Sequence, residues 1–182
     1  LLRHSQWPTE ALRYSATYNT VRDSPSPDWP RGDGSFGILE GFSSTVRLDG
    51  RQPVRYAVRA DVILETAMLL AFDASTWPPK TAADSDSAGT ASRLTQYLFA
   101  DSGLASGPRS DARGDSFGLL GWALDTPGSY WGDDNARSLL ALMAASALLR
   151  DTRWEEPIAK GILANLRTTG IHGFREACVT EA

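Results

Sequence analysis

The sequence predicts a mainly helical protein made of antiparallel helical hairpins, with a short β-hairpin and long loops in its N-terminal third. Apolar residues recur at helical spacing beyond residue 54, whereas glycine and proline interrupt much of the first 53 residues. An Asp-Gly pair between two short arms adds the hairpin. We therefore divide the chain into an N-terminal strand and loop segment, 1–53, and a helical-hairpin region, 54–182.

Composition excludes several classes of protein. The 182 residues are 42% hydrophobic and 22% charged, which suits a globular domain. The net charge of -4 argues against a nucleic-acid-binding protein, and every apolar stretch is too short or too charged to predict a membrane span. One cysteine and two distant histidines predict no metal site, and no cofactor-binding motif is present. We expect a soluble protein, either cytoplasmic or exported after removal of a signal.

The N-terminal segment is expected to hold a strand and a loop before the hairpin. Residues 12–21 alternate loosely in polarity and favour a strand, while a helix capped by Thr9 is nearly as plausible. The stretch 24–34 is rich in proline and glycine and predicts a loop.

The hairpin is predicted around Asp49-Gly50. These two residue types take up the positive φ angles of a two-residue turn, and they lie between the arms 45–48 and 51–54. Pro53 cannot donate a backbone hydrogen bond, so it limits the second arm to an edge strand or a very short strand.

Helical periodicity begins near residue 54 and continues to Phe72, so a first helix is expected there. The small and polar stretch 74–89 predicts a loop. A short amphipathic helix is expected over 91–100, with Leu94, Tyr97 and Leu98 facing inward. After a second loop, the apolar run 117–124 fits either a helix or a strand.

Residues 134–150 form the clearest helical segment. The run 139–145 is apolar on all sides, so we expect this helix to be the most buried one, without a solvent-exposed stripe. Thr152 and Glu155 match a capping box that opens a further helix, which is expected to end before Gly170.

Two adjacent acids, Asp133 and Asp134, open that buried helix directly after Tyr130-Trp131-Gly132. Aspartate is a favoured N-cap and complements the helix dipole, so we expect one of the two to cap the helix. The other is expected to face a ligand, with Trp131 as a stacking platform for a sugar ring. The structural alternative is two capping acids beside a buried tryptophan.

Three further acids are candidates. Asp61 and Glu65 lie four residues apart and share one face of an otherwise apolar helix. A buried network with Arg55 or Arg59 is the structural alternative to a functional role, because buried acids require partners. Glu40 lies between flanking glycines that allow a ligand to approach, and it is either a satisfied anchor or a site residue.

The stretch Tyr130-Trp131-Gly132-Asp133-Asp134-Asn135-Ala136-Arg137 resembles the six-hairpin glycosidase superfamily. Arg59-Ala60-Asp61 with Glu65 is similar to an inner helix of such domains. These are (α/α)6 toroids of glycoside hydrolases, unsaturated-uronyl hydrolases and N-acylglucosamine epimerases, whose cleft lies at the N-terminal ends of the inner helices. The likeness extends over about residues 36–175, and only the Trp-Gly-Asp-Asp stretch is specific.

The resemblance implies a carbohydrate-active enzyme that acts on a glycosidic bond with paired carboxylates. An aspartate at a helix N-terminus suits a base or nucleophile, and an acid in an apolar surround suits the proton donor. The catalytic candidates are Asp133, Asp134 and Glu40. The candidates for binding the carbohydrate substrate are Trp131, Tyr130, Arg137, Asp61 and Glu65.

Two rival functions are weighed against this one. A non-catalytic helical module would use the same acids as caps and ion pairs, for binding or assembly. A sugar epimerase would be expected to use histidines, of which the chain has two.

A full toroid needs twelve helices and the sequence predicts four, and Ile171, Phe174 and Val179 form an apolar tail after Gly170. We therefore expect association with the rest of its own domain or with a second copy.

Overall fold

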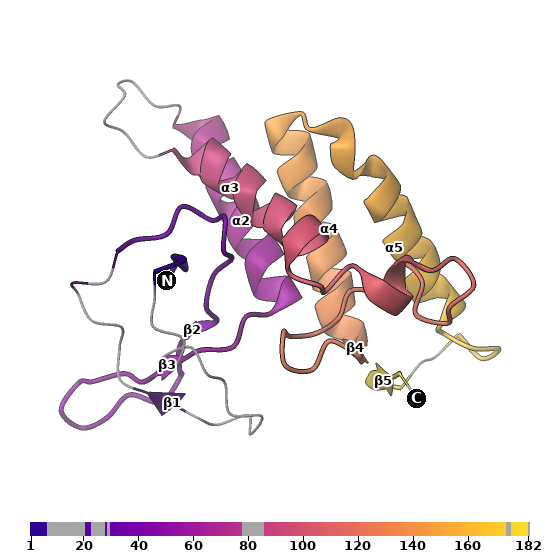
Figure 1. The fold of residues 1–182 in the computed structure, drawn as a ribbon, viewed down its shortest axis with the longest axis horizontal. Helices are drawn as coiled ribbons and strands as arrows, with labels where there is room; N and C mark the ends of the chain where they lie inside the picture. Colours follow the sequence, from indigo (N-terminus) through magenta and orange to yellow (C-terminus); the bar gives the residue numbers. More distant parts are fainter. Residues whose placement is uncertain (7–20, 23–27, 29, 78–85, 174–175, 182) are drawn as a thin grey trace.

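The fold is mainly helical, with a short antiparallel β-hairpin (Figure 1). The computed structural model describes residues 1–6, 21–22, 28, 30–77, 86–173 and 176–181. The elements of the first half are β1 (Val21–Arg22), β2 (Gly41–Phe42), β3 (Val54–Arg55), α2 (Ala60–Thr76), α3 (Ser87–Gln96) and the π-helical turn η1 (Tyr97–Asp101). Those of the second half are η2 (Gly107–Ser110), β4 (Ser129–Trp131), α4 (Gly132–Leu149), η3 (Thr152–Trp154), α5 (Glu155–Arg167) and β5 (Cys178–Thr180).

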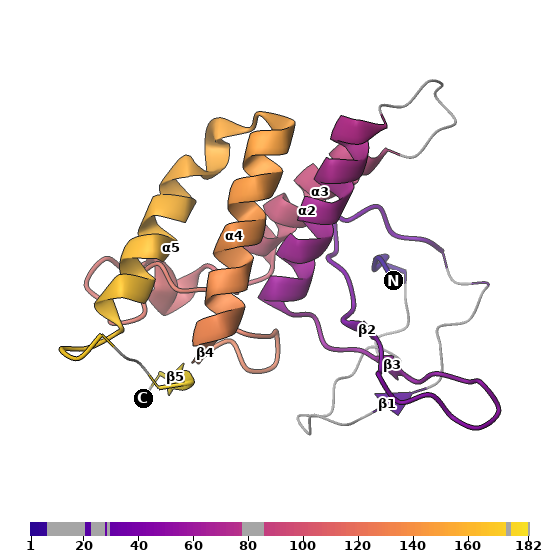
Figure 2. The same ribbon diagram turned by 180° about the vertical axis from the view of Figure 1, so that it is seen from behind.

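The helices form two antiparallel hairpins, α2 with α3 and α4 with α5. Helices α2 and α4 run parallel and pack side by side, so their N-terminal ends lie at the same end of the molecule (Figures 1 and 2). Helix α3 packs mainly on α2, and α5 packs on α4. The prediction of antiparallel helical hairpins is confirmed at this level.

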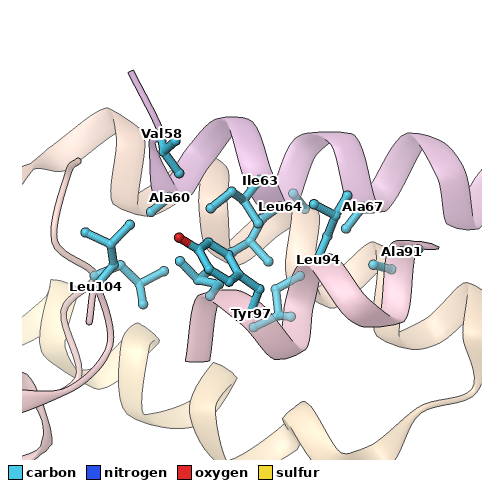
Figure 3. Packing of buried hydrophobic residues seen from close by; sticks show 14 of the residues in the cluster. Val58, Ala60, Ile63, Leu64, Ala67, Ala91, Leu94, Tyr97 and Leu104 are labelled. Carbon is cyan, nitrogen blue, oxygen red and sulfur yellow. The ribbon is translucent and has the colours of Figure 1, made fainter. Parts of the chain in front are cut away.

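The main core lies between α2, α3 and α4. Figure 3 shows Ile63, Leu64 and Ala67 of α2 above Leu94 and Tyr97, and all five are buried. Short side chains at the contact allow neighbouring helices to approach closely, while the leucines fill the space between them. The predicted inward face of the second helix is therefore confirmed.

Leu142 of α4 is fully buried in this core. We expect Leu142→Ala to lower the free energy of unfolding by about 3 kcal/mol, because the lost methyl groups leave a cavity that the helices fill only partly. Leu140→Ala on the same helix is the matched control, since Leu140 is 65% exposed. Equal losses in chemical denaturation would contradict the assignment of the buried face.

A turn lies near the predicted place, but it is a three-residue loop, so the prediction of a two-residue Asp49-Gly50 turn is wrong. The Arg47 N–H donates to the Arg51 carbonyl at 2.9 Å, and the Gly50 N–H donates to the Arg47 carbonyl at 2.9 Å. Gly50 has a φ of 80°, whereas Asp49 does not have a positive φ. The paired strands lie further out, because Gly41–Phe42 pairs with Val54–Arg55 in a sheet of order β1-β3-β2. Strand β3 has two residues, as expected after Pro53. The predicted strand over 12–21 lies outside the described residues except for Val21, which begins β1.

Helix α2 begins at Ala60, and the prediction of a helix from about residue 54 is wrong. Residues before Ala60 are held by segments distant in sequence: the Leu124 N–H donates to the Val58 carbonyl at 3.2 Å, and Arg59 forms a β-bridge with Ala123. At its other end α2 continues to Thr76, and α3 begins at Ser87, so both ends of the predicted loop over 74–89 are helical. Residues 78–85 of that loop lie outside the described residues.

Helix α3 begins at Ser87, where Asp86 caps it by accepting a hydrogen bond from the Gly89 N–H at 2.9 Å. The run 117–124 forms neither a helix nor a strand. It consists of turns and irregular backbone that pack against α4 and α5. Thr152 does not cap α5; Asp151 accepts from the Arg153 N–H, and η3 leads into the helix.

Helix α4 spans nearly the predicted residues, but it is not buried on all sides. Leu140 is 65% exposed and Met143 44%, so an apolar stripe faces solvent and the predicted all-round burial is wrong. Among the described residues α4 has helical neighbours in α2, α3 and α5, which cover only part of its circumference. None of the described helices is long and apolar enough to cross a membrane.

Candidate functional site

Charged side chains gather at the shared N-terminal end of α2 and α4, around Arg59. Its Nη2 lies 2.8 Å from Asp61 Oδ2 and 3.1 Å from Asp134 Oδ1, and its Nη1 lies 3.1 Å from Glu40 Oε1. The Arg59 side chain is 14% exposed, so these ion pairs are shielded from solvent. We define the Arg59 cluster by six residues: Glu40, Arg59, Asp61, Glu65, Asp134 and Arg137.

Arg137 closes the cluster on its solvent side. Its Nη2 lies 2.9 Å from Asp61 Oδ2, its Nε 2.9 Å from Glu65 Oε1 and its Nη1 3.3 Å from Asp134 Oδ1. The Arg137 side chain is 45% exposed and forms the rim of the cluster. The arginine network expected around Asp61 and Glu65 is therefore present, with Arg137 as a partner that the sequence did not indicate.

Backbone and amide hydrogen bonds bring the two helix ends together. The Ala60 N–H donates to the Trp122 carbonyl at 3.1 Å, which ties the segment after Leu120 to the start of α2. Asn135 of α4 accepts from the Leu120 N–H at 2.9 Å and donates to the Leu120 carbonyl at 3.0 Å. Asn135 thereby ties the same segment to α4, so the cluster has a fixed frame.

Two tryptophans lie beside the cluster. The ring centroids of Trp122 and Trp131 are 6.2 Å apart, and the Arg59 guanidinium carbon is 5.2 Å from the Trp122 ring. Trp131 Nε1 is buried and has no hydrogen-bond partner among the described residues. Sequence reasoning missed Trp122, whose position depends on backbone pairing with the start of α2.

Asp134 is held in an unusual environment for a carboxyl group. Burial raises its pKa to about 6, and the charges of Asp61 and Asp133 add to this effect while Arg59 and Arg137 oppose it. The raised pKa runs against the expectation that the helix N-terminus favours the anion, because burial and the two neighbouring acids oppose ionisation. The group can therefore hold or release a proton near neutral pH.

Neither aspartate caps α4, so the expectation that one of them does is wrong. The helix begins one residue earlier, at Gly132, and its N-cap position is Trp131, without a side-chain cap hydrogen bond. Asp133 and Asp134 both lie in the first turn, where they complement the helix dipole. Asp133 is exposed and lies outside the cluster.

Glu40 lies between two guanidinium groups. Its Oε1 is 2.7 Å from Arg55 Nη1 and 3.1 Å from Arg59 Nη1, so the expected apolar surround is wrong. The other carboxylate oxygen, Oε2, is buried without a hydrogen-bond partner among the described residues. Glu40 thus joins the cluster as an ion-paired carboxylate with one free acceptor.

Tyr130 lies apart from the cluster. It is 1% exposed, and its hydroxyl donates to Glu181 and accepts from Arg109 Nη1 at 3.0 Å. Burial raises the pKa of Tyr130, and the hydrogen bond to Glu181 raises it further. Tyr130 and Trp131 are successive residues of β4, so their side chains point to opposite faces and only Trp131 adjoins the cluster.

Neither a metal cluster nor a relative identifies the site. In the described parts of the chain, no three His, Cys, Asp or Glu side chains are grouped so that they could hold a metal ion. Comparison of the chain with protein-family models, curated proteins and solved structures finds no match. The site is therefore interpreted from its own geometry.

Proposed function

We propose that this protein is a carbohydrate-active enzyme of the glycoside hydrolase type, with the Arg59 cluster as its active site. The observation that carries the proposal is the group of carboxylates held around Arg59 at the shared N-terminal end of α2 and α4, with Asp134 and Glu40 each 3.1 Å from its guanidinium. Burial within this group raises the pKa of Asp134 to about 6. A carboxyl group that stays protonated up to about pH 6 can serve as the proton donor that cleavage of a glycosidic bond requires. The two helical hairpins are, in this proposal, part of an (α/α) toroid.

Asp134 is assigned as the general acid and Glu40 as its carboxylate partner, the reverse of the division expected from sequence. One guanidinium bridges them, with 3.1 Å from Arg59 to each carboxyl group. Because both carboxyl groups contact one guanidinium, the distance between the Asp134 and Glu40 carboxyl groups stays below roughly 9.5 Å, the upper limit for the carboxyl pairs of glycosidases. Glu40 would act on the sugar as base or nucleophile through its unpaired Oε2.

The groups beside the acids suit a carbohydrate. Sugar hydroxyls both donate and accept hydrogen bonds, and the cluster offers one buried donor, Trp131 Nε1, and one buried acceptor, Glu40 Oε2, without partners among the described residues. Aromatic rings stack on the apolar faces of sugars, and Trp131 supplies such a ring. Arg137 and Glu65 on the exposed rim add charged hydrogen-bonding groups.

The proposal is tested by incubating the purified chain with a panel of aryl glycosides and polysaccharides and measuring released reducing ends. We expect cleavage of at least one substrate, and a loss of at least about a hundredfold in Glu40→Gln. Asp133→Asn is the matched control, because Asp133 is exposed outside the cluster, and it should retain activity. A folded wild type that cleaves nothing on the panel would count against the proposal.

The alternative is a non-catalytic helical module, and exposed apolar side chains on three helices favour it. Such patches mark interaction surfaces in soluble proteins. The large exposed apolar residues of α2, α4 and α5 are Leu69, Phe72, Leu140, Met143, Leu148, Ile162, Leu163 and Leu166. Under either function, we propose that the rest of its own domain or a second copy covers this surface.

We expect Leu163→Glu to reduce this association. Leu163 is 64% exposed, so a charge there should leave the fold intact but oppose burial against a partner. Light scattering of the wild type and the variant measures the change in mass, and Glu156→Lys on the same exposed helix is the control. A wild-type monomer at micromolar concentration with a cooperative melt contradicts the proposed association.

A further inference from the structure

A second candidate site lies away from the Arg59 cluster, in a cavity of about 170 Å³ beside α4 and α5. Its apolar walls include Phe99, Phe117, Leu120 and Leu139, from η1, the segment before β4, and α4. No member of the Arg59 cluster lines it. An apolar cavity of about 150 Å³ is large enough to hold benzene, so this one has room for a compact ring.

Close backbone packing forms the cavity without any ligand. Gly118 has a φ of 85°, and a Cβ added there would lie 2.7 Å from the Lys160 carbonyl oxygen of α5. A Cβ at Gly161 would likewise collide with the Leu139 side chain of α4. On another side, the Phe99 ring stacks on Trp154 with centroids 5.1 Å apart. The walls are therefore fixed by glycines and a ring pair.

Arg109 lines this cavity and keeps one buried donor without a partner among the described residues. Its side chain is 7% exposed. Its Nη1 donates to the Tyr130 hydroxyl and the Pro127 carbonyl, each at 3.0 Å, and lies 3.5 Å from Glu181 Oε1, while its Nη2 donates to the Gly103 carbonyl at 2.8 Å. The third nitrogen, Nε, is buried and has no hydrogen-bond partner among the described residues. Leaving such a group unpaired is unfavourable, and a ligand acceptor would remove that penalty.

Lys160 adds a second positive charge to the wall. Its ammonium group lies 5.6 Å from the centre of the Phe117 ring and 2.6 Å from Glu156, an exposed residue that does not line the cavity. No carboxylate side chain is among the lining residues. Glu181 and Glu156, the carboxylate partners of Arg109 and Lys160, both lie outside the lining. A mostly apolar cavity lined by two cations and by no carboxylate favours an anion that carries an apolar body.

We propose that this cavity binds a small carboxylate whose apolar part is about the size of a benzene ring. The carboxylate accepts a hydrogen bond from Arg109 Nε and is attracted by Lys160, while the ring lies among the phenylalanines and leucines. This proposal is independent of the catalytic assignment, because none of its residues belongs to the Arg59 cluster.

Calorimetric titration of the full chain with benzoate tests the proposal, with benzyl alcohol as the neutral probe of similar shape. We expect saturable one-to-one binding of benzoate at millimolar concentrations and at least about tenfold weaker binding of benzyl alcohol, since a charge-assisted hydrogen bond is lost. No saturation by benzoate with folded protein, or equal affinity for both probes, overturns the proposal.

Two variants assign the binding to this cavity. Ala105→Met fills the space and should abolish benzoate binding, and Lys160→Gln should weaken it about threefold or more because it removes one charge. Glu156→Gln, which removes the partner of Lys160 outside the cavity, is the control and should bind benzoate at least as well as the wild type. Lys160→Gln also serves if Ala105→Met fails to fold. Wild-type affinity in Lys160→Gln places the ligand elsewhere and overturns the proposal.

Discussion

Arg59→Met is expected to lower the free energy of unfolding by about 3–5 kcal/mol. The substitution keeps an apolar stem of similar length but removes the cation that three carboxylates share, and an uncompensated buried charge is strongly destabilising. Asp61 is the most sensitive of the three, because its side chain is 0% exposed and lies 2.8 Å from Arg59. Denaturant unfolding at neutral pH measures the loss.

Arg137→Met is the matched comparison. Arg137 contacts Asp61 and Asp134 as Arg59 does, but its side chain is 45% exposed, so solvent replaces part of what is lost and the cost should be clearly smaller. Adding Asp134→Asn to Arg59→Met should restore part of the stability, because one repelling charge is removed. Similar costs for the two arginines would show that burial does not decide the strength of this network.

The same arginine links stability to the proposed chemistry. Burial lowers the pKa of the Arg59 guanidinium, but attraction by Asp61, Asp134 and Glu40 raises it overall, so it stays charged. That charge opposes the rise in the pKa of Asp134 without cancelling it. The cluster therefore combines a fixed cation with one carboxyl group that can exchange a proton, which a network of fully ionised pairs would lack.

Local patterns predicted the features that depend on local geometry. The i, i+4 spacing of Asp61 and Glu65 placed them on one helical face, and both contact Arg137. Arg137 itself was not predicted as their partner, although its spacing of three residues from Asp134 on one helix allows the ion pair that the two form. Helical periodicity likewise predicted two antiparallel hairpins, because each hairpin is formed by elements that are consecutive in the chain.

Features set by contacts between distant segments could not be predicted in the same way. The start of α2 at Ala60 depends on hydrogen bonds with Trp122 and Leu124, and the position of Trp122 depends on the same pairing. The exposed stripe of α4 depends on how many neighbours the helix has, which an apolar run cannot indicate. The roles proposed for Glu40 and Asp134 are the reverse of those expected because two arginines lie beside Glu40 and because Asp134 is buried next to Asp61, and neither contact is local in sequence.

Asp134→Asn is expected to lower the rate of glycoside cleavage by at least about a hundredfold, the smaller loss typical of removing an acid–base group. Asparagine retains the shape of the side chain but cannot donate an acidic proton to the leaving oxygen. The wild-type rate should fall as the pH rises above the pKa of Asp134, about 6, because the acid is then ionised. Asp133→Asn is the control and should keep the rate at low pH, while its pH profile should move slightly toward lower pH because the charge of Asp133 adds to the rise in the pKa of Asp134.

A readout that needs no substrate comes from the same carboxyl group. The pKa of Asp134 is raised from 3.8 to about 6 in the folded protein, so folding favours its protonated form. Its contribution to stability is therefore fully present below pH 3.8 and is lost as the pH rises through about 6. Asp134→Asn should remove this part of the pH dependence of unfolding, whereas Asp133→Asn should leave most of it. Full turnover by Asp134→Asn on every glycoside that the wild type cleaves would refute the catalytic role, and an unchanged pH dependence of unfolding would refute the shifted pKa on which that role depends.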